Sequence, residues 1–84
     1  MVKVIVYTAH YCPYCKAAKE FLKSKNVEFE EIDVTNDDEQ RKKIEKLSGQ
    51  KTVPQIFIND RSIGGFSDMK ALDGKGELDQ LLGI

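Results

Sequence analysis

The chain has 84 residues, a net charge of −1 and 32% charged residues, which is typical of a small soluble globular protein. We therefore expect a single domain over residues 1–84, and the near-neutral charge argues against a nucleic-acid partner. No stretch approaches the ~18 apolar residues that a membrane span needs, and no signal peptide is predicted. These features predict a cytoplasmic protein, in which a lone pair of cysteines is expected to be reactive or metal-binding.

The first predicted elements are a strand and a helix. Residues 2–7 are mostly β-branched or aromatic, which predicts a buried strand. Apolar positions then recur at helical spacing within residues 17–25. Pro13 suits the first position of this helix, which makes Cys12 its N-cap residue, and Asn26 is a candidate C-cap residue.

A second strand and helix follow. Residues 27–34 predict a strand, but their alternation is interrupted, so the strand either contains a bulge or begins later than residue 27. Asn36 begins a capping-box pattern that predicts the start of a second helix. We expect this helix to turn Ile44 and Leu47 inward and to end at Gly49.

The C-terminal third predicts a hairpin and a last helical region. Two short strands, residues 55–58 and 61–63, flank a two-residue turn. Ser67 or Asp68 is expected to cap the last helical region, which two glycines interrupt before it continues to Leu82. The order strand–helix–strand–helix–strand–strand–helix predicts an α/β fold with a parallel strand pair joined by a right-handed crossover. We expect a four-stranded mixed sheet with helices on both faces.

The most informative feature is the segment Cys12-Pro13-Tyr14-Cys15, which holds the only two cysteines of the chain. A thiol at a helix N-cap faces unpaired backbone N–H groups and the positive end of the helix dipole, and both stabilise a thiolate. We therefore predict that Cys12 is substantially ionised and attacks an external disulfide, with Lys16 and Lys19 adding positive potential. Cys15, inside the first turn, is predicted to be more buried, to have a raised pKa and to close a Cys12–Cys15 disulfide.

Other interpretations of these segments stay open. The cysteine pair could be half of a zinc site, but His10 is the only further ligand nearby, so a structural zinc is not expected. A metal or cluster shared between two chains is harder to exclude. Thr52-Val53-Pro54 alone predicts no more than the start of a strand. Gly64-Gly65-Phe66-Ser67-Asp68 predicts either a helix N-terminus that holds a carboxylate or a simple turn with a helix cap.

Taken together, three segments resemble a known family. Cys12-Pro13-Tyr14-Cys15, Thr52-Val53-Pro54 and Gly64-Gly65 with Ser67-Asp68 are similar in identity, order and spacing to dithiol glutaredoxins, over nearly the whole chain. The resemblance implies a thioredoxin-like fold and a cis peptide bond before Pro54. It also implies glutathione as a co-substrate and no metal.

The resemblance further implies a groove that binds glutathione. Its lining would be Tyr14, Arg41, Lys51, Thr52, Val53, Pro54, Gly65, Phe66, Ser67 and Asp68. The backbone of Val53 would pair with the cysteinyl part of glutathione, and Arg41 and Lys51 would hold the glycyl carboxylate. The helix start at residues 66–67 would hold the γ-glutamyl carboxylate, and Asp68 would bind the ammonium group.

The implied activity is the reduction of protein disulfides and glutathione mixed disulfides through Cys12 and Cys15. We expect a monomer that serves electron transport and cell redox homeostasis, with ribonucleotide reductase among its candidate partners. Ala9 stands where many glutaredoxins carry a lysine that helps to bind the glycyl carboxylate. Two rivals stay open: an electron donor to ribonucleotide reductase that a flavoprotein reductase recharges, and an iron–sulfur module formed by Cys12 of two chains with two glutathiones.

Overall fold

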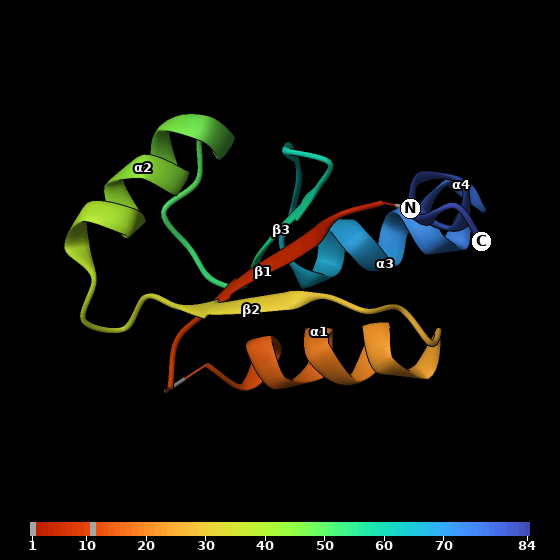
Figure 1. Cartoon of the computed structure of the whole chain (residues 1–84), viewed down its shortest axis with the longest axis horizontal. Helices are drawn as coiled ribbons and strands as arrows, with labels where there is room; N and C mark the ends of the chain where they lie inside the picture. Colours follow the sequence, from red (N-terminus) through yellow and green to blue (C-terminus); the bar gives the residue numbers. More distant parts are fainter. Residues whose placement is uncertain (1, 11) are drawn as a thin grey trace.

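The computed structural model describes residues 2–10 and 12–84. Its elements are β1 (Val4–Thr8), α1 (Pro13–Ser24), β2 (Glu30–Asp33), α2 (Asp38–Ser48), β3 (Gln55–Ile58), β4 (Arg61–Gly64), α3 (Phe66–Gly74) and α4 (Glu77–Leu82). The strands form one mixed sheet in the order β2-β1-β3-β4, in which β1 and β2 are parallel and the pairs β1–β3 and β3–β4 are antiparallel. Helices α1 and α2 lie on opposite sides of this sheet (Figure 1). The predicted α/β fold is confirmed.

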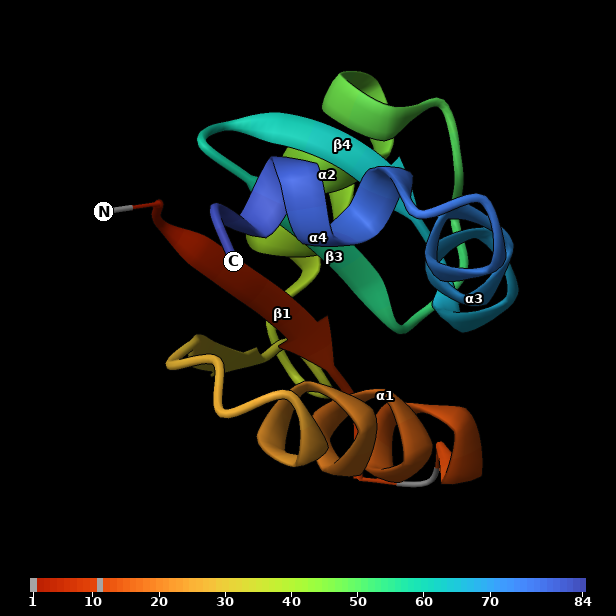
Figure 2. The same cartoon turned by 90° about the vertical axis from the view of Figure 1, so that its right-hand side faces the viewer.

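The core has two parts because successive residues of β1 point to opposite faces of the sheet. Val4 and Val6 join the larger cluster, which contains the buried side chains of α1, α3 and α4. Ile5 joins Ile44 and Phe57 in the smaller cluster on the α2 side. Figure 2 shows α4 in front of the strands and α2 behind them.

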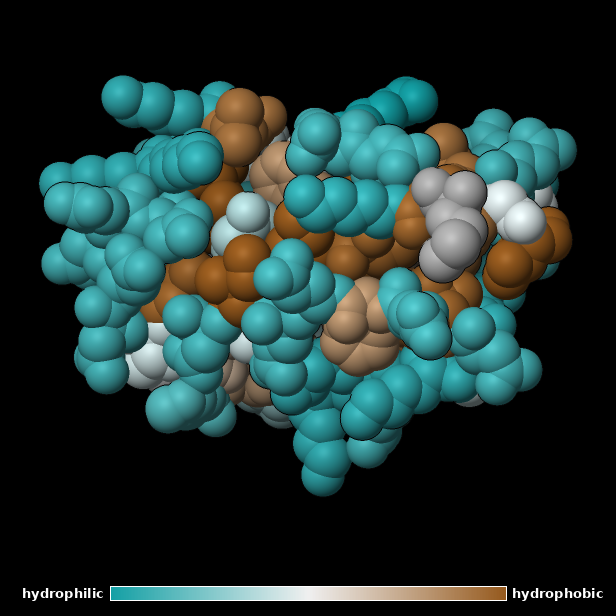
Figure 3. Space-filling model, viewed as in Figure 1, coloured by the Kyte–Doolittle hydropathy of each residue, from teal (hydrophilic) through white to brown (hydrophobic). Residues whose placement is uncertain are grey.

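One face of the molecule is mainly hydrophilic (Figure 3). Polar and charged side chains cover most of the face shown in Figure 3, with apolar groups visible between them. Within residues 2–10 and 12–84, no helix is both long and apolar enough to cross a membrane.

Helix α1 begins where the sequence predicts. Cys12 is its N-cap residue, with extended backbone angles (φ −103°, ψ 107°), and Pro13 occupies the first helical position. Ala18 and Leu22 are fully buried and dock the helix on the sheet. The C-cap is Lys25, one residue earlier than predicted.

Helix α2 differs from the prediction at two points. Its N-cap is Asp37, whose side chain accepts the backbone N–H three residues later, and not Asn36. Ile44 is buried as predicted, but Leu47 is 62% exposed, because the last turn of α2 lies away from the sheet (Figure 1). The helix ends at Gly49, whose left-handed backbone (φ 75°) satisfies the C-cap prediction.

Strand β2 begins at Glu30. Of the two predicted alternatives, a bulge or a start later than residue 27, the structure has the later start. The hairpin between β3 and β4 is confirmed. Its turn residues Asn59 and Asp60 both have positive φ (51° and 66°), the conformation of a tight hairpin turn. Strand β4 extends one residue further than predicted, to Gly64.

The last helical region consists of two helices, as its glycines indicate. Helix α3 begins at Phe66 with Gly65 as N-cap, so neither Ser67 nor Asp68 is the cap residue. Asp68 still stabilises this end, because its carboxylate accepts the backbone N–H of Gly65 at 2.9 Å.

Candidate active site

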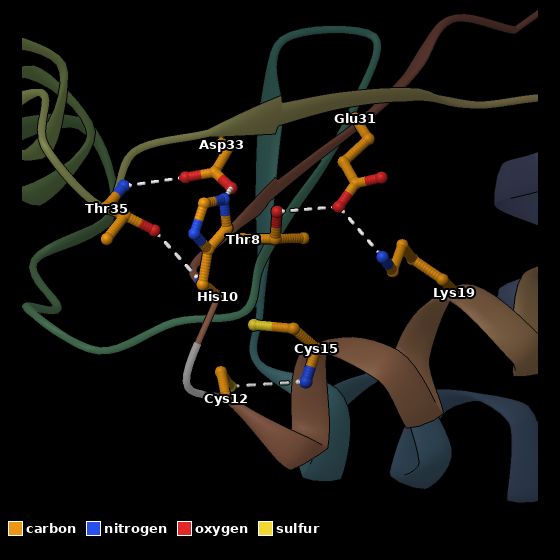
Figure 4. A network of polar contacts seen from close by, with 8 residues as sticks. All are labelled: Thr8, His10, Cys12, Cys15, Lys19, Glu31, Asp33 and Thr35. Atoms are coloured by element: carbon orange, nitrogen blue, oxygen red, sulfur yellow. Dashed lines mark hydrogen bonds and ion pairs between the residues drawn. The ribbon is translucent and has the colours of Figure 1, made fainter.

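Cys12 lies where the N-terminus of α1 meets the loop before β3. The half-buried Sγ of Cys12 accepts the backbone N–H of Cys15 at 3.2 Å, as Figure 4 shows. As a thiol, the same Sγ donates to the backbone carbonyl of Val53 at 3.4 Å. Pro13 has no N–H, so the helix donor that this sulfur meets, the amide of Cys15, lies three residues along the chain. The predicted N-cap position of Cys12 is confirmed.

Cys15 has a different environment. It is 2% exposed, and both cysteines are free thiols. Burial, together with the hydrogen bond to the Cys12 sulfur, raises the pKa of the Cys15 thiol to about 12. The backbone N–H of Ala9 and the ammonium of Lys19 act in the opposite direction. Cys15 is therefore a neutral thiol near pH 7, and the predicted burial and raised pKa are confirmed.

A surface groove runs past Cys12 in two adjoining sections that share Thr52 and Val53. The section beside Cys12 has a volume of ≈ 360 Å³, and the section toward α3 has a volume of ≈ 370 Å³. The two sections contain every residue expected of a glutathione groove: Tyr14, Arg41, Lys51, Thr52, Val53, Pro54, Gly65, Phe66, Ser67 and Asp68. Gln50 also lines the groove, which the sequence analysis missed although Gln50 directly precedes Lys51.

The backbone on the far wall of the groove is tightly placed. The Val53–Pro54 peptide bond is cis, as the resemblance implied. Gly64 has a φ of 106°, and a Cβ atom there would lie 2.4 Å from the Asp68 carboxylate. A Cβ on Gly65 would lie 3.4 Å from the carbonyl oxygen of Pro54. Gly64 therefore requires glycine because of its positive φ and the nearby Asp68 side chain, whereas a Cβ on Gly65 would make an ordinary contact.

The two sections of the groove contain different charged groups. Arg41 and the exposed Lys51 lie beside Cys12, with the Lys51 ammonium 3.9 Å from a carboxylate on α2. The other section contains the N-terminus of α3 and the Asp68 carboxylate. Tyr14, 63% exposed, faces Phe66 with ring centroids 6.3 Å apart, which gives the groove an aromatic wall.

Comparison with known proteins decides the family. The family model described as Glutaredoxin matches residues 4–63. The chain belongs to the glutaredoxin family. It is 48% identical to glutaredoxin 3 of Escherichia coli over 82 residues, which are 98% of this chain and 99% of that protein. Family membership makes the chain a thiol–disulfide oxidoreductase and accounts for its paired cysteines.

Solved glutaredoxin structures share the thioredoxin-like fold. The solution structure from Brucella melitensis is 48% identical, has a TM-score of 0.86, and matches across 98% of this chain and 89% of that one. The buckwheat glutaredoxin–glutathione complex has a TM-score of 0.91 at 25% identity, across 98% of this chain and 77% of that one.

A polar network on the other side of Cys15 was not foreseen. The Lys19 ammonium donates to Glu31 Oε2 at 2.9 Å, and the buried Thr8 hydroxyl donates to the same oxygen at 2.8 Å (Figure 4). These contacts lower the pKa of the Glu31 carboxyl, and the hydrogen bond to Glu31 raises the pKa of Lys19. Lys19, predicted to add positive potential near Cys12, pairs instead with β2 on the side of Cys15.

His10 lies in a second part of this network. Its imidazole pairs with Asp33, and its backbone N–H donates to the Thr35 hydroxyl at 2.9 Å. Hydrogen bonds from Thr35 lower the pKa of the Asp33 carboxyl. In the part of the chain that the structure describes, no cluster of three or more His, Cys, Asp or Glu is placed to bind a metal.

Proposed function

We propose that this chain is a glutathione-dependent oxidoreductase that reduces protein disulfides and glutathione mixed disulfides through Cys12 and Cys15. The observation that carries the proposal is the position of Cys12 within a groove whose two ends suit the two ends of glutathione. One end presents cationic side chains, and the other presents a helix N-terminus beside a carboxylate.

Cys12 is the nucleophile of the proposed reaction. Its sulfur is half-buried at the N-cap of α1 and accepts the backbone N–H of Cys15. Cys15 remains protonated near pH 7 because of its burial, so the two thiols have distinct roles. The attack forms a mixed disulfide on Cys12, and Cys15 is the resolving thiol.

Glutathione would be held along its whole length. The backbone of Val53 would pair with the cysteinyl part as a neighbouring strand would, with Tyr14 covering it. Arg41 and Lys51 would hold the glycyl carboxylate. The N-terminus of α3 would hold the γ-glutamyl carboxylate, and Asp68 would bind the ammonium group. The existence of a buckwheat glutaredoxin–glutathione complex supports glutathione as the ligand.

Two routes follow from these roles. For a glutathionylated protein, the Cys12 thiolate attacks the glutathione sulfur and the protein leaves as a thiolate; a second glutathione then releases Cys12 and forms glutathione disulfide. For a protein disulfide, Cys12 forms a mixed disulfide with the protein, and Cys15 displaces the second protein thiol. The resulting Cys12–Cys15 disulfide takes two electrons from two glutathione molecules, which are oxidised to glutathione disulfide.

We further propose that the protein acts as a monomer in the cytoplasm. Protein substrates would be disulfide-containing enzymes such as ribonucleotide reductase. A substrate disulfide must reach Cys12 from solvent, and the open groove beside Cys12 provides that access.

A coupled assay with glutathione and a glutathione mixed disulfide tests the proposal. Lys51→Gln should raise the KM for the mixed disulfide about 1.4- to fivefold, because an exposed ion pair contributes about 0.2–1 kcal/mol. Lys46→Gln, at an exposed position in the last turn of α2, is the matched control and should leave KM unchanged. Activity with dithiothreitol but not with glutathione would contradict the proposal.

Asp68→Asn tests the other end of the groove. The amide retains an oxygen that can accept the backbone N–H of Gly65, so the cap of α3 is preserved while the negative charge is lost. We expect a higher KM for the glutathione mixed disulfide and an unchanged melting temperature. An unchanged KM would show that Asp68 does not bind the ammonium group.

A further inference from the structure

We propose that Lys19 is a positioning residue for the resolving step: its ammonium, held by Glu31, stabilises the Cys15 thiolate that closes the Cys12–Cys15 disulfide. This inference rests on the two-cysteine route proposed above. Its test uses no glutathione, so the two proposals can fail separately.

The first support is a groove on the other side of Cys15. It has a volume of ≈ 490 Å³ and is open to solvent between α1 and the strands β1 and β2. Cys15 and Lys19 both line it, and they lie four residues apart on α1, the spacing that places side chains on one helix face. Figure 4 shows both side chains reaching from α1 toward β1 and β2.

The second support is that the ammonium is held in place. Glu31 Oε2 accepts both the Lys19 ammonium (2.9 Å) and the Thr8 hydroxyl (2.8 Å). Thr8 is 2% exposed, and Glu31 aligns with Val6 in the parallel pairing of β1 and β2. The Lys19 side chain is 28% exposed, so this surface ion pair is fixed at one end by the buried part of the sheet.

The third support is the chemistry that Cys15 must perform. Burial opposes its ionisation, whereas the charge of Lys19 favours the thiolate. Within the Lys19–Glu31 ion pair, the Lys19 ammonium is thus the group that acts on the Cys15 sulfur. The other titratable groups that line the groove are His10, Cys12, Lys16, Glu20, Lys23 and Asp33.

The resolving step can be observed directly with one equivalent of dithiobis-nitrobenzoate. The Cys12 thiolate attacks the reagent, breaks its S–S bond and releases a first coloured thiolate. The Cys15 thiolate then attacks Cys12 Sγ, the bond from Cys12 to the second nitrobenzoate sulfur breaks, and a second coloured thiolate leaves. The Cys15 proton passes to solvent. The second phase of release therefore reports on the ionisation of Cys15.

Lys19→Gln should slow the second phase about threefold and leave the first phase unchanged. The Lys19 charge favours the Cys15 thiolate, so its removal lowers the thiolate fraction. Of a fall of about tenfold, the greater nucleophilicity of the more basic thiolate would recover about threefold. Lys19→Arg should restore the second phase. Lys23→Gln, the same charge change two helical turns beyond Cys15, should leave it unchanged. Equal second phases in wild type and Lys19→Gln, or equal slowing by Lys19→Gln and Lys23→Gln, would overturn the proposal.

A spectroscopic readout separates this role from a merely structural one. In the Cys12→Ser protein Cys15 is the only cysteine, so its Cβ chemical shift followed against pH gives its pKa. Adding Lys19→Gln should move that titration to higher pH, and an unchanged midpoint would overturn the proposal. If the wild-type protein had no activity with glutathione but the results expected for Lys19 were found, the proposed function would be overturned and this inference would stand.

Discussion

The buried thiol of Cys15 should make the fold lose stability in alkaline solution, by an amount that the structure sets. In the folded protein its pKa is about 12, against an ordinary value of 9.0. Below pH 9 both the folded and the unfolded chain keep the proton, so the thiol contributes no pH dependence. Between pH 9 and 12 the unfolded chain loses the proton while the folded chain keeps it, so stability falls as pH rises.

The size of this loss follows from the linkage of protonation to folding. At about pH 10.5 the unfolded thiol is ionised and the folded thiol is not, which costs about 1.5 pH units at about 1.4 kcal/mol per unit. We therefore expect Cys15 alone to lower the free energy of unfolding by about 2 kcal/mol at that pH.

Urea unfolding of the reduced protein near pH 7.5 and near pH 10.5 measures the loss, with Cys15→Ala as the reference. Tyr7, whose pKa is also raised by burial, contributes equally to both proteins and cancels in the comparison. The wild type should lose about 2 kcal/mol more than Cys15→Ala between the two conditions. Equal losses would refute the assignment of a buried neutral thiol to Cys15.

Three further changes test the roles and the packing. Cys15→Ser should retain the reduction of glutathione mixed disulfides and lose turnover of protein disulfides, and loss of both in steady-state assays would contradict the assigned roles. Leu22→Ala, at a fully buried position of α1, should cost about 3 kcal/mol in urea unfolding, whereas Leu47→Ala should cost less than about 0.5 kcal/mol. Gly64→Ala should cost about 1–3 kcal/mol, because the added Cβ would lie 2.4 Å from Asp68 at a φ of 106°; an unchanged melting temperature would count against the tight turn.

The parts of the fold that the sequence predicts well depend on local signals. The apolar spacing that buries Leu22, the helix start at Pro13 and the positive-φ turn before β4 each arise from a few neighbouring residues. The misplaced caps arise where neighbours are chemically equivalent. Asn36 and Asp37 are both good N-cap residues, so the sequence does not distinguish them. Gly65 is the N-cap residue of α3 but has no side chain by which the sequence could identify it as a cap.

The features that the sequence could not reveal depend on long-range pairing. Leu47 continues the apolar spacing of α2. Its exposure depends on the position of the sheet, which gives the last turn of the helix no apolar surface to pack against. The contacts of Glu31 with Lys19 and Thr8 require the parallel register of β1 and β2, which no local pattern encodes. The grouping of the expected groove residues beside Cys12 was predictable because most of them lie in short contiguous segments that resemble a known family.

The most direct test of the central claim is the equilibrium of the Cys12–Cys15 disulfide with mixtures of glutathione and glutathione disulfide. Quenching by alkylation and mass spectrometry gives the oxidised fraction at each ratio. We predict reversible exchange with a midpoint of roughly −200 to −230 mV, the range of glutaredoxins. A disulfide that dithiothreitol reduces but that glutathione leaves untouched at every ratio would contradict the proposal that glutathione is the reductant.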